Sequence, residues 1–97
     1  MHKQIVYTRP VIRSFADKET ESLFASERTR RLPQDIHRRA MRRLYQLDAA
    51  SSLEILRYPP SNLLEALRGD RAGQWSIRIN DEWRVCFRFD NGDAFDV

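Results

Sequence analysis

Five arginines in the C-terminal part of this sequence are the residues best suited to chemistry. Arg78, Arg84 and Arg88 stand at alternate positions of two predicted strands and so share one face, and Arg68 and Arg71 lie just before those strands. A row of guanidinium groups can hold a phosphate and stabilise the charge that develops when a phosphate ester is cleaved. The pattern therefore makes phosphate chemistry one candidate activity.

Two explanations of these arginines are compatible with the sequence. Arginines directly across a strand pair repel each other, so something must offset their charge. A bound polyanion is one possibility. Neutralisation within the fold is the other, and the nearby carboxylates are Glu65, Asp70 and Asp90.

A second group of arginines lies on a predicted helix and in the residues before it. Arg38 stands four residues from Arg42, and Arg39 four from Arg43, so each pair places like charges side by side, with only Asp35 and Asp48 to relieve them at the helix ends. The group is either a solvated face or a face that follows nucleic-acid phosphates. The preceding residues add three more cations: Arg28, Arg30 and Arg31.

Other reactive side chains are few. The histidines are His2 and His37, far apart, and Cys86 is the single cysteine, so we expect no metal, no cofactor and no disulfide. Cys86 is interpreted as a packed strand residue rather than a nucleophile. Trp75 and Trp83 fall on the apolar side of the predicted strands, which favours core positions over base stacking.

Composition limits the class of protein. The chain has 97 residues, 41% hydrophobic and 32% charged, with a formal net charge of +3, so it predicts one small folded domain. Fifteen of the 17 basic residues are arginine. No apolar run reaches membrane-spanning length and no signal peptide is recognisable, so we expect no membrane association and a cytoplasmic location.

The elements that position these arginines begin with two helices. Asp17 is a suitable N-cap for a short first helix with acidic residues in its first turn. Pro33 suits the first position of a second helix, in which one apolar stripe recurs at helical spacing. The stripe consists of Ile36, Ala40, Leu44 and Leu47.

The C-terminal forty residues predict an antiparallel sheet. Apolar and polar residues alternate through 74–80 and again through 83–90, and pairing Ile79 with Trp83 sets Arg78 opposite Arg84 and Ser76 opposite Cys86. Asn91-Gly92 predicts a tight turn into a last strand, and the glycines of 69–73 predict another turn. Short strands are also expected at residues 4–8 and 11–15. The fold class is α+β, with two N-terminal helices packed on a small antiparallel sheet.

Four motifs give the chain a family resemblance. Leu-Asp-Ala-Ala (47–50), Gly-Asp-Arg-Ala-Gly (69–73), Trp-Ser-Ile-Arg (75–78) and Trp-Arg-Val-Cys-Phe (83–87) resemble the HigB toxins of the RelE superfamily. The resemblance covers residues 11–97, which makes them a single toxin domain and residues 1–10 an N-terminal extension.

The resemblance implies a toxin of a bacterial type II toxin–antitoxin pair. Such toxins enter the ribosomal A site and cut mRNA without a metal: the RNA 2′-hydroxyl attacks its neighbouring phosphate. The implied partners are the ribosome, mRNA and a HigA-like helix-turn-helix antitoxin, through which the toxin reaches operator DNA indirectly.

The resemblance also assigns roles to residues. Arg84 matches the family's phosphate-binding arginine, and Arg68 stands where many members have a catalytic lysine, so these two are the predicted catalytic residues. The remaining arginines of both groups are expected to bind RNA: Arg71, Arg78, Arg88, Arg31, Arg38, Arg39, Arg42 and Arg43.

Two departures from the family pattern bear on activity. Glu65 stands where some members have a histidine, and the chain stops at Val97, about where the family has a terminal segment whose Tyr and His belong to the active site. The expectation is therefore either a truncated sequence or an inactive toxin that only binds its antitoxin or the ribosome. A shortened last strand is also expected to leave apolar core partly uncovered.

Overall fold

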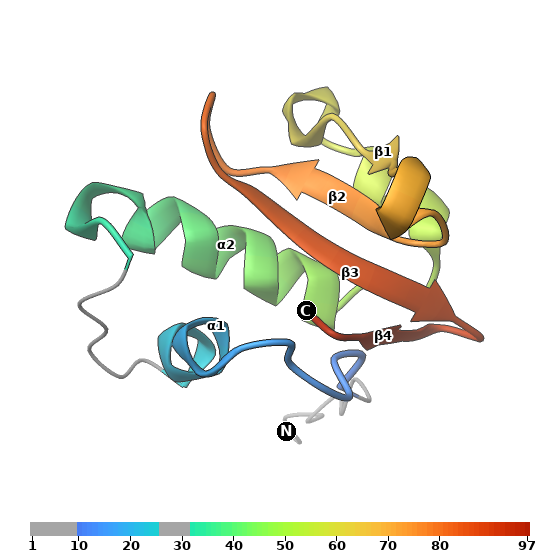
Figure 1. The fold of residues 1–97 in the computed structure, drawn as a ribbon, viewed down its shortest axis with the longest axis horizontal. Helices are drawn as coiled ribbons and strands as arrows, with labels where there is room; N and C mark the ends of the chain where they lie inside the picture. The colour runs from blue at the N-terminus through green and yellow to red at the C-terminus, as the bar shows by residue number, and fades with distance from the viewer. Residues whose placement is uncertain (1–9, 26–31) are drawn as a thin grey trace, which may run out of the picture.

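The computed structural model describes residues 10–25 and 32–97 (Figure 1). These residues form two α-helices and a four-stranded antiparallel sheet with strand order β1-β2-β3-β4, so the predicted α+β fold is confirmed. The helices are α1 (Lys18–Phe24) and α2 (His37–Asp48), and the strands are β1 (Glu65–Ala66), β2 (Trp75–Arg78), β3 (Arg84–Asp90) and β4 (Asp93–Phe95). Short 3-10 helices connect them: η1 (Gln34–Ile36), η2 (Leu53–Arg57), η3 (Pro60–Asn62) and η4 (Gly69–Arg71).

The core lies between the sheet and α2, which crosses one face of the sheet with α1 beside it (Figure 1). The predicted apolar stripe of the second helix is confirmed, because its four residues are at most 3% exposed. Opposite them, Ile77 and Phe87 of the sheet are fully buried. Trp75 and Trp83 are partly buried against this core, as expected for core rather than surface residues.

The helix starts follow the sequence signals with one correction. Asp17 caps α1, and its Oδ1 accepts a hydrogen bond from the Thr20 amide at 2.7 Å. Pro33 was expected at the first position of the second helix, but it precedes the 3-10 turn η1, and α2 begins only at His37. A 3-10 turn is common at helix starts, which explains the shift of about one turn.

The β2–β3 hairpin has the predicted register. Arg78 lies opposite Arg84 and Ser76 opposite Cys86. The regular pairing of β2 ends at Arg78, because the amides of Ile79 and Asn80 both donate to the Trp83 carbonyl, at 2.9 and 3.2 Å, and close the turn. In this register Ser76, Arg84 and Cys86 lie on the opposite side of the sheet from Ile77 and Phe87, which pack in the core.

The expected last strand is present and begins after Asn91 and Gly92, whose φ angles of 49° and 81° are those of a tight hairpin turn. The expected strand at 11–15 is reduced to a parallel bridge between Ile12 and Ala94. Backbone hydrogen bonds nevertheless join this segment to the C-terminal residues, among them Arg13 N–H to the Ala94 carbonyl at 2.7 Å. The expected strand at 4–8, together with His2, Arg28, Arg30 and Arg31, lies outside the described residues.

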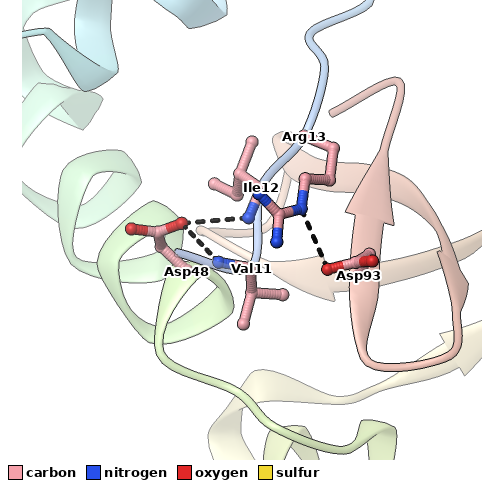
Figure 2. Close-up of polar contacts among 5 residues, drawn as sticks. All are labelled: Val11, Ile12, Arg13, Asp48 and Asp93. Carbon is pink, nitrogen blue, oxygen red and sulfur yellow. Dashed lines mark hydrogen bonds and ion pairs between the residues drawn. The ribbon is translucent and has the colours of Figure 1, made fainter. Parts of the chain in front are cut away.

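Asp48 fastens the N-terminal segment to the end of α2. Its Oδ1 accepts the Val11 and Ile12 amides at 3.0 and 2.9 Å, while Arg13 pairs with Asp93 at 3.0 Å (Figure 2). From the sequence, Asp48 was expected to reduce the repulsion among the helix arginines. In the structure its carboxylate instead accepts these two backbone amides. The reason is tertiary: the two amides need an acceptor once they leave water.

The polar side of the sheet is partly covered by the residues between α2 and β1. Asn62 and Ser76 are both fully buried. The Asn62 side-chain amide donates to the carbonyls of Leu56 and Tyr58 at 3.1 and 3.2 Å, which holds the connection in place. Only part of the predicted arginine face is therefore open to a ligand.

Candidate RNA-binding and cleavage site

Arg84 is the most firmly held arginine of the sheet. Its Nε donates to the Ser76 hydroxyl at 2.7 Å, its Nη2 donates to the Leu63 carbonyl, and the Glu65 carboxylate lies 3.9 Å away. The Arg84 side chain keeps 29% exposure, so its outer edge still reaches solvent. A guanidinium fixed on its inner edge and open on its outer edge is suited to binding an anion.

Arg88, four residues along β3 from Arg84, and Arg71, which lines a cavity with Arg84, have weaker attachments. Arg88 pairs with Asp96 at 3.4 Å, and its side chain is 49% exposed. Arg71 donates to the Gln74 side-chain carbonyl at 3.1 Å. We call these three residues, Arg71, Arg84 and Arg88, the anchored arginines.

The offsetting carboxylates are only partly those expected. Glu65 does face Arg84, as the sequence suggested. The other partners are different, because Arg78 pairs with Asp81 and Arg88 with Asp96 rather than with Asp70 or Asp90. Arg78 is close in sequence to Asp81 across the hairpin turn, whereas Asp96 reaches Arg88 only through the pairing of β3 with β4.

Arg68 is exposed at the start of η4, beside the left-handed Gly69, whose φ is 64°. Its side chain makes no ion pair among the described residues, in contrast to Arg84. The structure therefore places the two predicted catalytic residues in different settings, one anchored and one free to reorient.

A cavity of about 410 Å³ adjoins two of the anchored arginines, Arg71 and Arg84. Its lining also includes Cys86, core residues such as Leu23 and Val85, and the acidic residues Asp17, Glu19 and Asp96. Cys86 is half-buried and unpaired. The cavity thus combines cationic, anionic and apolar residues.

The helix arginines divide into two sets that the sequence does not separate. Arg39, Arg42 and Arg43 line a second cavity, and Arg78 from the end of β2 joins them there. Arg38 is exposed but does not line this cavity. Sequence periodicity assigned Arg78 to the sheet group, and it could not reveal that Arg78 also meets the helix, where its backbone carbonyl accepts a hydrogen bond from Arg43 Nε at 2.8 Å.

Two further observations concern the remaining chemistry. Across residues 10–25 and 32–97, no group of three or more His, Cys, Asp and Glu side chains is placed to hold a metal ion. His37 instead contacts the Leu32 carbonyl at 3.0 Å. None of the helices in the same ranges is both long and apolar enough to cross a membrane.

Comparison with known proteins decides the family. A model of the RelE-like toxin HigB of type II toxin–antitoxin systems matches residues 13–97. The chain belongs to the HigB-like toxin family. Toxin HigB-1 of Vibrio cholerae is 37% identical over 84 residues, covering 86% of this chain and 88% of its own. Endoribonuclease HigB of Proteus vulgaris is 36% identical over 85 residues, covering 88% and 91%.

The resemblance drawn from the four sequence motifs is thereby confirmed. As a HigB-like toxin, the chain is one member of a type II toxin–antitoxin pair and has a cognate antitoxin as its partner. The α+β architecture fits the RelE-like fold that this family implies.

Proposed function

We propose that this HigB-like toxin inhibits translation by cleaving mRNA on the ribosome, with Arg84 as the central phosphate-binding residue. The observation that carries the proposal is the anchoring of Arg84 by Ser76, Leu63 and Glu65 beside an open cavity. The relative from Proteus vulgaris bears the name endoribonuclease, which supports the same activity here.

The proposed reaction is an internal transfer of the RNA phosphate. The 2′-hydroxyl gives its proton to water as its oxygen attacks the adjacent phosphorus, the bond from phosphorus to the 5′ oxygen breaks, and that oxygen takes up a proton from water. The products are a 2′,3′-cyclic phosphate and a 5′-hydroxyl end. No group beyond the RNA is consumed.

In this reaction the arginines act as fixed charges. Arginine stays protonated in proteins, so Arg84 and Arg68 stabilise the negative charge that grows on the phosphate rather than transfer protons. Arg84 is bound through Nε and Nη2, and its Nη1 faces no acceptor among the described residues, which leaves that nitrogen for the phosphate. Arg71 and Arg88 flank it and bind neighbouring phosphates.

The partners follow from the same proposal. Residues 11–97 act as the toxin domain, with residues 1–10 as an extension, in the cytoplasm where ribosomes and mRNA are found. The exposed arginines of α2 contact ribosomal RNA, and Arg31 before the helix is assigned to the same contact. The antitoxin is a HigA-like helix-turn-helix protein that carries the toxin to operator DNA.

The proposal is tested by incubating the chain with ribosomes stalled on a defined mRNA and mapping breaks by primer extension. Cleavage in the A site with a cyclic phosphate end is expected, and Arg84→Glu abolishes it. Arg57→Glu is the control, because Arg57 is exposed and its one ion pair among residues 10–25 and 32–97 is with Glu54. Cleavage that survives Arg84→Glu contradicts the site assignment.

A second arm adds a family-like Val-Asp-Tyr-His segment after Val97. Cleavage confined to the extended chain assigns proton transfer to that segment and charge stabilisation to the arginines. If neither version cuts but both sediment with ribosomes, the chain is a binding protein and the nuclease proposal fails.

A further inference from the structure

A cavity of about 290 Å³ is built where α2, η3 and the end of β2 meet. We call it the arginine pocket. Its lining residues come from three separate stretches of the chain: Arg39, Arg42, Arg43, Ser61, Arg78 and Ile79. Four arginines and one serine therefore surround a single space.

The arginine pocket contains no carboxylate on its wall. Arg78 has a carboxylate partner in Asp81, but that residue is 93% exposed and outside the lining. Arg39 and Arg42 make no ion pair among the described residues. Four cations in one space repel one another, so the pocket is an unbalanced positive site.

Arg43 shows the strength of this imbalance. It is half-buried, and its Nε donates to the Arg78 carbonyl at 2.8 Å, which fixes the guanidinium at the pocket wall. Burial, together with the positive charges of Arg39, Arg42 and Arg78, lowers the pKa of Arg43. An anion in the pocket would remove part of this electrostatic cost.

We propose that the arginine pocket is a second RNA site, separate from Arg84, that binds one backbone phosphate. The inference rests on the proposed function for the source of the phosphate, the RNA of the ribosome. Guanidinium groups match phosphate oxygens, and the Ser61 hydroxyl adds a neutral donor. The lining has no aromatic or amide side chain to stack on or read a base, so binding is independent of sequence.

An acidic peptide is the competing ligand, and the lining argues against it. Peptide interfaces are held mainly by apolar anchors placed in pockets. Ile79 is the only apolar residue on the wall, and it is 7% exposed, so it offers little surface for such an anchor. Phosphate, which needs only donors and charge, fits the lining better.

The first test measures binding of short oligodeoxythymidylate, which presents backbone phosphates but has no 2′-hydroxyl to react. The titration is carried out at constant ionic strength, and changes in the NMR signals of the arginine Nε–H groups show which arginines bind the oligonucleotide. The double variant Arg39→Gln/Arg42→Gln is expected to weaken binding at least tenfold. The control Lys18→Gln/Arg57→Gln removes the same charge elsewhere and leaves the affinity within twofold.

Equal loss in the variant and the control would overturn the proposal, because it would mean a diffuse charge effect. Inorganic phosphate and an oligoaspartate peptide are titrated in parallel. Tighter binding of inorganic phosphate than of the oligonucleotide would contradict the proposal, because it would mean that the ligand of the pocket is a free anion and not an RNA backbone phosphate. Tighter binding of oligoaspartate than of the oligonucleotide would also contradict it, because it would mean that the pocket binds an acidic protein and not RNA.

The second test uses ribosomes and the salt dependence of co-sedimentation. Loss of one phosphate contact is expected to reduce the slope of log K against log salt by about 1 in Arg39→Gln/Arg42→Gln. An unchanged slope contradicts the site. Arg84→Gln separates the two proposals, since it removes cleavage and leaves oligodeoxythymidylate binding at the arginine pocket intact.

Discussion

The anchored arginines and the arginine pocket use the same side chain in opposite ways. Arg84 is tied to a buried serine, a backbone carbonyl and a glutamate, whereas Arg39 and Arg42 point into a space without any carboxylate on its wall. In the anchored arginines, Arg84 and Arg88 each have a carboxylate within 3.9 Å, and Arg71 is held by a neutral amide. The arginine pocket is looser and concentrates positive charge.

This difference separates two tasks in handling RNA. Charge stabilisation in a reaction requires donors already oriented toward the changing phosphate, so their positions must be held by the fold. Attraction of a nucleic acid depends mainly on net charge and the release of counterions, and it tolerates flexible side chains. We therefore expect the anchored arginines to control cleavage and the arginine pocket to control affinity.

The largest expected effect comes from Arg84→Gln. The substitution keeps a polar side chain of similar length but removes the charge, and the cleavage rate should fall by about 10²–10³-fold, as for loss of one preoriented donor. Single-turnover cleavage on saturating ribosomes measures the effect. An equal fall in the cleavage rate of Arg39→Gln/Arg42→Gln under the same saturating conditions would contradict the assignment of cleavage to the anchored arginines and of affinity to the arginine pocket.

A substitution away from both groups of arginines should lower the stability of the fold without separating cleavage from RNA affinity. Asp48→Ala removes the carboxylate that accepts the Val11 and Ile12 amides, although the Val11 amide keeps the Asp48 backbone carbonyl at 3.1 Å, and it should lower the free energy of unfolding by about 1–3 kcal/mol. Urea denaturation followed by tryptophan fluorescence measures it. Asp35→Ala, in the exposed turn before α2, is the control, and a similar loss there would show that the two amide contacts are not the cause.

Local patterns in the sequence predicted the regular secondary structure of this fold, the β2–β3 hairpin and the buried side of α2. The alternation of polar and apolar residues was enough to place Arg78 opposite Arg84, because a shift of one residue would have exposed Trp83. The spacing of Leu44 and Leu47 likewise identified the buried side of α2. Both patterns depend only on neighbours in sequence.

Tertiary contacts escaped prediction. Nothing near Asp48 indicates that it binds the amides of residues 11 and 12, since the partner lies 36 positions away. The two-residue strand β1 is exposed and carries no alternation. Ser61 had no signal as a site residue, and Arg78 was assigned to the sheet face alone although it also lines a cavity with the arginines of α2. Such sites form from segments that the chain brings together only after folding.

A smaller effect is expected from loss of the serine that holds Arg84. Ser76→Ala removes one charge-assisted hydrogen bond at a fully buried position, and cleavage should fall about tenfold, equivalent to about 1.5 kcal/mol. Oligodeoxythymidylate binding at the arginine pocket should not change. Ser61→Ala is the matched substitution in the arginine pocket. It should weaken oligodeoxythymidylate binding at the pocket and leave the cleavage rate unchanged. Identical profiles for the two serines would contradict the division of tasks.

The smallest expected effect is a gain. Asp81→Asn removes the carboxylate that pairs with Arg78 and leaves four unopposed guanidinium groups around the arginine pocket. Because Asp81 is exposed and water screens its charge, affinity for oligodeoxythymidylate should rise only about two- to threefold. Titration at low and high salt measures it, with Asp70→Asn, on the exposed η4 turn, as the charge-matched control. A gain of the same size in the control would mean that net charge alone sets the affinity, whereas a gain confined to Asp81→Asn shows that Arg78 acts within the pocket.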